Sequence, residues 1–348
     1  MVLGLLLYGT HAIYFSKLYA VYSYFESVYI LTGLSIYPIY YIYILLRAGH
    51  NAGIKTHYKH FLPAIVLAVL SLFSTFLLPP EQRVSYVRDI LINKNLGSIL
   101  SASTVGLKAL IFFTSRFIFL MQVIFYAIKG ISVVAQHTKK VHNYYSNVEG
   151  KTLNRIRDIN VVILFVSVSS IIFTFIGRSY FSQNEVFLVI PSLIFSAVLF
   201  IIGFNGNQEV VLSEHITADE NLDAIFEEIE SENGINLKSQ LIQLFEEDKI
   251  YKYPNLRITT VSEKLETNRT YISKLINDEF GMNFNEFVNQ YRIIDAKYML
   301  SSELLNIYTL EHIAEKSGFG SVASFSRVFK EIEGVTPGKF RTQNRTAN

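Results

Sequence analysis

Two short segments near the C-terminal end of the sequence carry polar side chains at helical spacing. Between Asn268 and Asn277, the apolar residues Ile272, Leu275 and Ile276 share one side of an expected helix. The polar residues are candidate nucleic-acid contacts: Asn268, Arg269, Thr270, Ser273, Lys274 and Asn277. Arg and Asn can make paired hydrogen bonds to base edges, whereas a Lys ammonium suits phosphate. We therefore expect this segment to recognise double-stranded DNA.

The second segment, Ser321 to Lys330, has the same pattern with fewer polar groups. Its expected buried residues are Phe325, Val328 and Phe329. The candidate base contacts are Ser321, Val322 and Ser324, and the candidate phosphate contacts are Arg327 and Lys330. A Val side chain can read only a thymine methyl group. We expect the first segment, through Arg269, Thr270 and Ser273, to supply most of the sequence discrimination.

Each polar segment is preceded by a shorter helical segment and a turn, which is a helix-turn-helix pattern. The first pattern runs from Ile258 to Asn277 and turns at Glu266-Thr267. The second begins at Thr309, a good N-cap, and turns at Gly318, since a left-handed backbone suits Gly. A leading helix is marked by Leu237, Leu241, Leu244 and Phe245.

A long helix is expected between the two patterns, as a spacer that fixes them. It opens with a capping box, Asn283 and Glu286. Its expected apolar positions are Phe284, Phe287, Val288, Tyr291, Ile294, Ala296 and Leu300.

The stretch GFGSVASFSRVFKEIEGVTPGKFR, from Gly318 to Arg341, resembles the C-terminal signature of the AraC/XylS-type transcription regulators. Residues 267–292 are similar to the first recognition helix and connecting helix of that family. The resemblance implies a seven-helix reader whose two recognition helices enter adjacent major-groove turns, about 34 Å apart. The sequence departs from the family at Glu266, where Gly is usual, which would make the turn tighter or differently shaped. It also departs at Arg257, a cap position for which Thr259 or Thr260 could substitute.

The first 204 residues contain apolar runs close to the roughly 20 residues needed to cross a bilayer. The expected spans are Tyr24–Leu46, Phe61–Leu78, Leu107–Ile128, Ile159–Ile176 and Glu185–Phe204, with the shorter Val2–Ser16 as a sixth. The number of runs disfavours the alternative, a soluble domain with buried core helices. We expect an all-α protein in which a polytopic bundle of about six spans precedes the helix-turn-helix domain, similar to a membrane-embedded subgroup of the family.

Charge divides the sequence into three blocks. Residues 1–204 hold 16 Lys and Arg against 6 Asp and Glu, residues 205–236 hold 9 acids and no Lys or Arg, and residues 237–348 hold 15 basic and 14 acidic residues. We expect a transmembrane region at 1–204, an acidic juxtamembrane linker at 205–236 and a DNA-binding domain at 237–348. The near-neutral last block leaves open a helical interaction module that does not bind DNA.

The orientation follows from the location of DNA. If residues after Phe204 are cytoplasmic, alternating spans place the loops 47–60 and 129–158 inside as well. These loops carry nine Lys and Arg against five in the opposite loops, in agreement with the positive-inside rule. We expect a multi-pass protein of a bacterial inner (cytoplasmic) membrane, with its DNA-binding domain in the cytoplasm.

Charged residues within apolar runs are candidates for an intramembrane signal site, and we select Glu26 and Arg116. Arg116 would face either a polar pocket or a packed helix. Lys108 is expected to extend towards the membrane surface from a span end. The inner-loop histidines His50, His57 and His60 have no carboxylate partner, so we expect no metal site there.

The sequence therefore predicts a membrane-bound, sequence-specific transcription regulator that couples a membrane or extracellular signal to gene expression. Alternatives are a transporter-like or receptor protein whose helix-turn-helix domain mediates interactions, and a regulator that is anchored without sensing. With no Cys and no nucleotide-binding glycine motif after Phe204, we expect neither an enzyme nor a cofactor. The expected partners are double-stranded DNA and the lipid bilayer. A second copy of the chain and RNA polymerase are candidates, and the inducing ligand is unknown.

Overall fold

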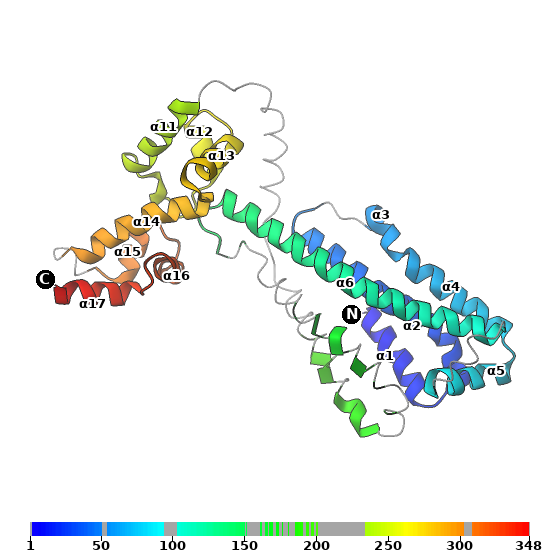
Figure 1. Ribbon diagram of the computed structural model, residues 1–348. Coiled ribbons are helices and arrows are strands. Elements are labelled where there is room, and N and C mark those ends of the chain that lie inside the picture. Colours follow the sequence, from blue (N-terminus) through cyan, green and yellow to red (C-terminus); the bar gives the residue numbers. More distant parts are fainter. Residues whose placement is uncertain are drawn as a thin grey trace. The chain divides into compact units, whose positions relative to one another are not determined.

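The computed structural model describes residues 2–50, 54–93, 103–149, 151, 234–302 and 308–347, with scattered residues between 161 and 200. Within these ranges the chain is helical and holds no strand beyond one isolated bridge, as the sequence predicted. It forms two compact units, Met1–Ala135 with Leu153–Glu209, and Gln136–Thr152 with Val210–Asn348. Figure 1 labels the helices of both units.

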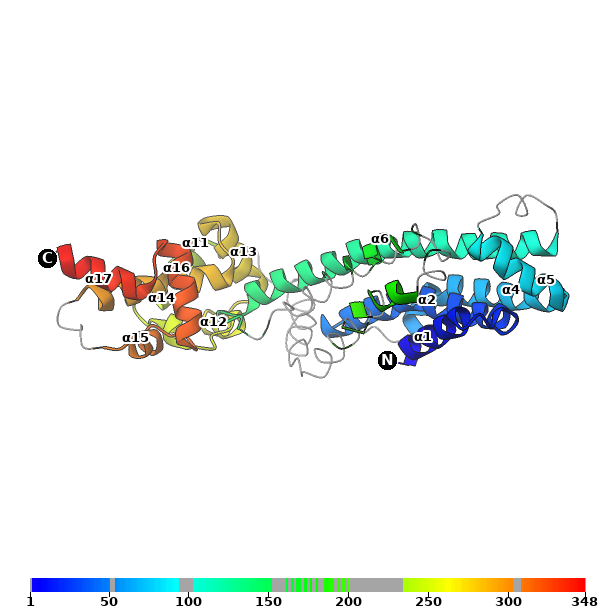
Figure 2. The same cartoon turned by 90° about the horizontal axis from the view of Figure 1, so that it is seen from below.

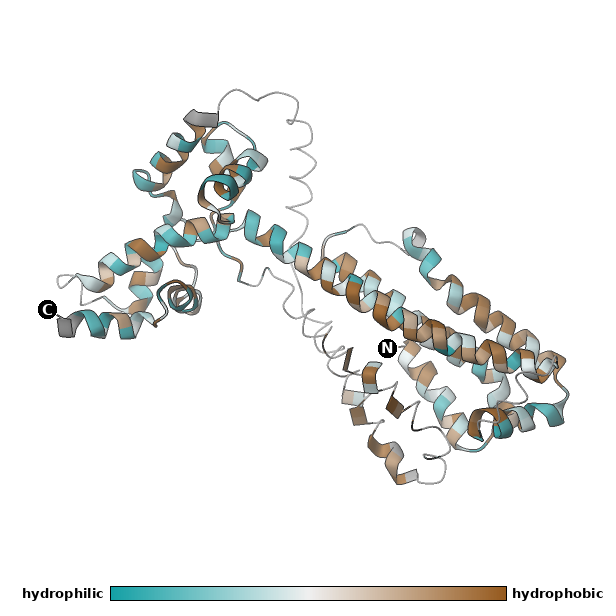
Figure 3. Cartoon of the chain, viewed as in Figure 1, coloured by the Kyte–Doolittle hydropathy of each residue, from teal (hydrophilic) through white to brown (hydrophobic). Residues whose placement is uncertain are grey.

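The first unit is a bundle of apolar helices. Its elements are α1 (Val2–Phe15), α2 (Tyr19–Arg47), α3 (Ile54–His57), η1 (Tyr58–Phe61), α4 (Leu62–Leu77), α5 (Pro80–Ser85), the π-helical η2 (Tyr86–Ile92) and most of α6 (Thr104–Tyr144). Helix α2 packs against α1 and α4, and Ile30, Leu67 and Ile111 join α2, α4 and α6 in one core cluster. Other apolar side chains, such as Phe73 and Phe76, are exposed, and α4 is predominantly hydrophobic along its length (Figure 3).

Among the described residues, three helices are long and apolar enough to cross a membrane: Tyr19–Arg47, Tyr58–Leu77 and Thr104–Tyr144. They contain the expected spans at 24–46, 61–78 (to Leu77) and 107–128. Helix α1 has 14 residues and is shorter than a typical span. The expected spans at 159–176 and 185–204 fall on residues that are described only in part, and the linker up to residue 233 lies outside the described residues.

Helix α6 is longer than the sequence predicted, because much of the expected loop 129–158 is helical up to Tyr144. A single glycine, Gly130, costs about 1 kcal/mol in a helix interior and does not end it. The last turns are stabilised by Val141 and Tyr144, which are buried in the core of the second unit. Residues 136–152 thus belong to the C-terminal unit, although the sequence-based division put them in the membrane region.

The second unit contains seven α-helices within its described residues. They are α11 (Gly234–Glu246), α12 (Ile258–Lys264), α13 (Arg269–Phe280), α14 (Phe284–Ser301), α15 (Leu310–Lys316), α16 (Val322–Glu333) and α17 (Pro337–Ala347), with the 3-10 turn η5 (Ile250–Lys252) after α11. Phe287 of α14 packs in one cluster with α11, α12 and α13, whereas Ala296 packs in a second cluster with α15 and α16. Helix α14 is therefore the shared support of both helix-turn-helix units (Figure 2).

Most of the expected helix signals are confirmed. Asn283 and Glu286 form the capping box, Thr309 caps α15, and Gly318 has a φ of +86°. Two expectations were wrong. Ile294 is 63% exposed and Ile293 is buried instead, because α14 presents different faces to the two clusters. Arg257 caps α12 without a side-chain hydrogen bond, and neither Thr259 nor Thr260 substitutes because both lie inside the helix.

The turn at Gly318 has no room for a side chain. A Cβ there would lie 2.5 Å from the Tyr251 carbonyl oxygen and 2.7 Å from the Lys252 Cα, both in η5. We expect Gly318→Ala to lower the local unfolding free energy of α15 and α16 by about 3 kcal/mol, since left-handed strain and overpacking add. Gly334→Ala is the matched control, because Gly334 has a φ of +74° but an open surrounding, and should cost about 1 kcal/mol. Amide hydrogen exchange in the full chain measures both, and equal effects would contradict the packing argument.

Candidate DNA interface

The two recognition helices begin with the same capping arrangement. The side chain of Asn268 accepts a hydrogen bond from the backbone N–H of Tyr271 at 2.9 Å, and that of Ser321 accepts one from Ser324 at 3.1 Å. These caps satisfy donors that would otherwise be unpaired and fix where each helix begins. Because Ile276 and Phe325 are buried, the rotation of each helix about its axis is fixed as well.

On α13, the structure separates the predicted contacts into exposed and engaged side chains. Thr270, Lys274 and Asn277 are exposed, as expected of residues that meet DNA. Arg269 and Ser273 are half-buried, and the Arg269 guanidinium carbon lies 5.6 Å from the centre of the Tyr144 ring. The Asn268 side chain acts as the cap described above.

The sequence reasoning missed Tyr271, which is 36% exposed beside Thr270. Its position directly after a polar pair at the helix start was the available signal. A Tyr there can stack on or donate to a nucleotide from the same face as Thr270 and Lys274.

Among the predicted contacts on α16, only the two phosphate contacts are fully exposed. Arg327 and Lys330 point to solvent, whereas Ser324 is buried and Val322 packs against the second core cluster. The structure therefore argues against base contacts by Ser324 and Val322, because the first turn of α16 rotates these side chains towards α14. Ala323, which the prediction did not include, is exposed in their place.

Both helix-turn-helix turns use the left-handed backbone at the same point. Glu266 has a φ of +50°, and Gly318 holds the corresponding place in the second unit. The Thr267 N–H donates to the Ser262 carbonyl at 3.0 Å, which closes the first turn. The departure at Glu266 thus leaves the left-handed conformation in place, at a strain of about 1 kcal/mol for a residue with a Cβ.

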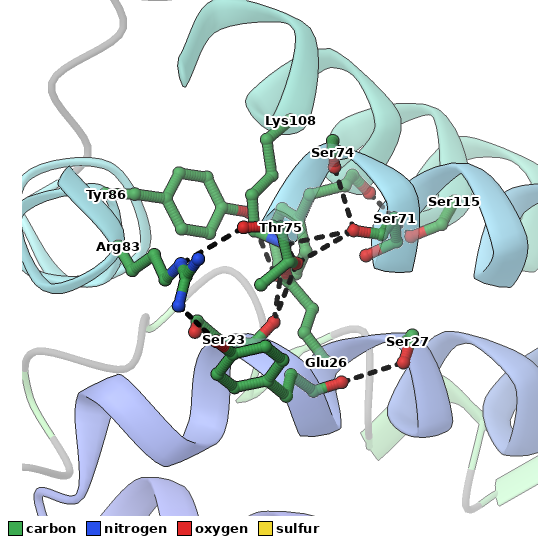
Figure 4. Close-up of polar contacts among 12 residues, drawn as sticks. Ser23, Glu26, Ser27, Ser71, Ser74, Thr75, Arg83, Tyr86, Lys108 and Ser115 are labelled. Atoms are coloured by element: carbon green, nitrogen blue, oxygen red, sulfur yellow. Dashed lines mark hydrogen bonds and ion pairs between the residues drawn. The ribbon is translucent and has the colours of Figure 1, made fainter. Parts of the chain in front are cut away.

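A buried polar cluster occupies the first unit, separate from these helices (Figure 4). Lys108 of α6 forms an ion pair with Glu26 of α2 at 2.9 Å, and both side chains are fully buried. Its ammonium also donates to the Thr75 hydroxyl at 2.6 Å, and the Tyr86 hydroxyl donates to Glu26 at 2.9 Å. The expectation that Lys108 extends to the membrane surface was wrong, because α2 provides a counterion beside it.

Arg116, the second candidate for a signal site, packs between aromatic rings. Its guanidinium carbon lies 4.6 Å from the Tyr29 ring centre and 4.9 Å from that of Phe112. These contacts favour helix packing over the polar pocket that the sequence left open.

The inner-loop histidines make aromatic and hydrogen-bond contacts. The rings of His57 and His60 stack at 5.6 Å, and His60 Nδ1 lies 2.8 Å from the Tyr126 hydroxyl. Among the described residues, no group of three or more His, Cys, Asp or Glu is placed to hold a metal ion.

The C-terminal helices match known regulators. Residues 261–343 match the family model described as a helix-turn-helix domain. The chain is 34% identical over 91 residues to the transcriptional regulator YtdP of Bacillus subtilis, covering 26% of this chain and 11% of YtdP. It is 29% identical over 89 residues to the Msm operon regulatory protein of Streptococcus mutans, covering 26% of this chain and 31% of that protein.

One solved structure, the C-terminal domain of the two-component response regulator yesN from Fusobacterium nucleatum, matches with a TM-score of 0.27 and 28% identity. The match covers 30% of this chain and 98% of that one. The C-terminal unit of the present chain contains an AraC-type helix-turn-helix domain. Both relatives are named as regulatory proteins. The chain spans about a tenth to a third of the length of these two relatives.

The buried ion pair gives a test of the first unit. Glu26→Gln or Lys108→Met alone leaves one uncompensated buried charge and should destabilise the bundle by about 3–5 kcal/mol. The double variant Glu26→Gln with Lys108→Met should recover most of that loss, because no charge is left unpaired. Thermal unfolding of the full chain in detergent measures the three variants, and single variants as stable as the original chain would refute the pairing.

Proposed function

We propose that this chain is a membrane-bound, sequence-specific transcription regulator that reads DNA through α13 and α16. The main observation in support of DNA recognition is the pair of capped recognition helices, which share the supporting helix α14 within a domain of AraC type. Specific base contacts come from α13, through the exposed Thr270 and Asn277 and through Arg269, which lies over the Tyr144 ring. Helix α16 contributes mainly phosphate contacts through Arg327 and Lys330.

Membrane attachment is the second part of the proposal. Three long apolar helices and the exposed apolar side chains of α4 support it. The excess of Lys and Arg at 47–60 and 129–158 favours a cytoplasmic DNA-binding domain, in a bacterial inner membrane. Burial of Val141, Tyr144, Tyr145 and Val148 in the core of the DNA-binding unit supports the same assignment, since that loop and the domain then face one compartment.

Signal coupling would pass through α6. This helix holds Lys108 of the buried ion pair in the first unit, and its last turn holds Tyr144 in the core of the second. We assume two arrangements of the bundle. A membrane or extracellular signal that binds one of them more tightly would raise its population at the expense of the other. The Glu26–Lys108 cluster is the proposed point of action, whereas a regulator that is anchored without sensing remains the alternative. A second copy of the chain and RNA polymerase are the proposed protein partners.

Genome-wide mapping of bound DNA separates sensing from anchoring. We expect the original chain to change its occupancy when growth conditions change. The double variant Glu26→Gln with Lys108→Met should keep the same sites but lose that response, because the charged cluster is gone. Identical, unvarying occupancy by both chains in every condition would favour an anchor.

Base reading is tested by two charge-matched substitutions. Arg269→Ala removes a cation at the start of α13 and should weaken specific binding by about 1–3 kcal/mol while relaxing the preferred sequence. Lys238→Ala removes the same charge beside Glu279, near the other end of α13, and should leave the preference unchanged. Selection from a random duplex library, repeated at several salt concentrations, measures both. Binding independent of salt would contradict phosphate contacts altogether.

A further inference from the structure

Residues 141–149 form a segment that we call the docking segment. The N-terminal part of this segment packs into the second unit. Val141, Tyr144 and Tyr145 are buried in the first core cluster. The Ser146 N–H donates to the Leu256 carbonyl at 3.0 Å, and the Asn285 amide donates to the Ser146 carbonyl at 2.6 Å. This part is anchored by apolar burial and by satisfied backbone groups.

The other end of the docking segment lies against the start of α16. The Ser321 hydroxyl donates to the Glu149 carboxylate at 2.8 Å. A Cβ added to Gly320 would lie 2.6 Å from the Asn147 side-chain nitrogen, so Asn147 closely covers the backbone just before the helix. At this end Val148 is still buried in the first core cluster, whereas Asn147 and Glu149 make polar contacts nearer the surface, and Glu149 is exposed.

The covered position is the one that DNA needs. The start of a helix favours anions, including the phosphates of the DNA backbone that a recognition helix approaches. Glu149 places a carboxylate at the start of the 12-residue α16, where a phosphate oxygen could accept the same hydrogen bond from Ser321. The carboxylate and the DNA backbone therefore cannot occupy this position together.

We propose that residues 147–149 are an intramolecular cover over the N-terminus of α16, and that the second helix-turn-helix unit engages DNA only after this cover is displaced. The inference rests on the proposed DNA-binding function and adds a control to it. With the cover in place, α13 alone can read DNA, so binding is weaker and the contacted site is shorter. Residues 147–149 follow α6 in the chain, so a change in the bundle can bias the cover through one continuous helix.

A disulfide between residues 147 and 320 tests the cover directly. The sequence contains no Cys, so the variant Asn147→Cys with Gly320→Cys has no competing thiol. The only heavy atoms found near a Cβ on Gly320 belong to the Asn147 side chain, which this variant replaces. The full chain in lipid nanodiscs is assayed with duplexes selected from a random library by the reduced variant.

We expect oxidation to weaken binding about tenfold or more, in the range of ordinary allosteric coupling, and to shorten the footprint by about one helical turn. Reductant should restore both, and the two single-Cys variants should not respond to oxidation. Glu149→Gln should strengthen binding several-fold by weakening the cover, whereas Glu247→Gln, an exposed acid that contacts Gln243, should not.

The remaining outcomes would contradict the proposed cover. Equal affinity and footprint in both oxidation states would overturn it while leaving the proposed function intact. Failure to form the disulfide would show that residues 147 and 320 do not meet. Failure of the reduced variant and of the original chain to select any duplex would refute DNA recognition, and the cover with it.

Discussion

The burial of one cation, the Arg292 guanidinium, constrains how the second unit is assembled. Arg292 is 1% exposed, and burial lowers its pKa to about 9, so the group remains charged at neutral pH. A buried charge is tolerated only when its donors are satisfied. Arg292 donates to the carbonyls of Tyr251 and Tyr253 at 2.8 Å and to the Ser146 hydroxyl at 3.1 Å. All of these acceptors are neutral oxygens, so two separate chain segments, residues 251–253 and Ser146, must converge on α14 to satisfy it.

That convergence also sets the geometry between the two helix-turn-helix units. The Tyr251 carbonyl, held by Arg292, is the atom nearest to a Cβ built on Gly318, and the guanidinium carbon lies 5.6 Å from the ring of Phe319. The turn of the second helix-turn-helix is therefore packed against η5, which precedes the first helix-turn-helix in the chain. Through Ser146, the same guanidinium holds the docking segment between them. The hydrogen bonds of Arg292 therefore position both the recognition helices and the docking segment.

Local sequence signals were sufficient to predict the helices of the second unit. Contacts between residues far apart in the sequence could not be predicted from such signals. The capping box at Asn283 and the left-handed turn at Gly318 depend on neighbouring residues, and both are present. The burial of Ser324 and the exposure of Ile294 were not predicted, because the rotation of a helix depends on what it packs against. Lys108 was misassigned because its counterion is in a different helix, although Glu26 and Lys108 carry opposite charges in two apolar runs.

The docking segment was harder still to predict from sequence. Residues 136–152 contain Lys, His, Asn and Ser and read as a polar loop between two apolar runs. Their apolar members, including Val141 and Tyr145, become core only because α11 and α14 supply a surface for them. The burial of Arg292 could not be predicted from sequence either, since an Arg in a long helix is ordinarily expected at the surface.

The energetics of the docking segment limit which part can move. Extracting Val141, Tyr144 and Tyr145 would expose three buried side chains at about 1.5–3 kcal/mol each, besides the bonds of Ser146. That cost is comparable with the roughly 4–10 kcal/mol by which specific DNA binding exceeds non-specific binding, so full release would abolish most of the discrimination. Displacing residues 147–149 exchanges the polar contacts of Asn147 and Glu149 for water or phosphate, at about 1 kcal/mol per hydrogen bond, and exposes Val148 at about a further 1.5–3 kcal/mol. The anchored part can therefore remain in the core and support Arg269 through Tyr144, while the end that covers α16 opens and closes within the range that a signal in the bundle can bias.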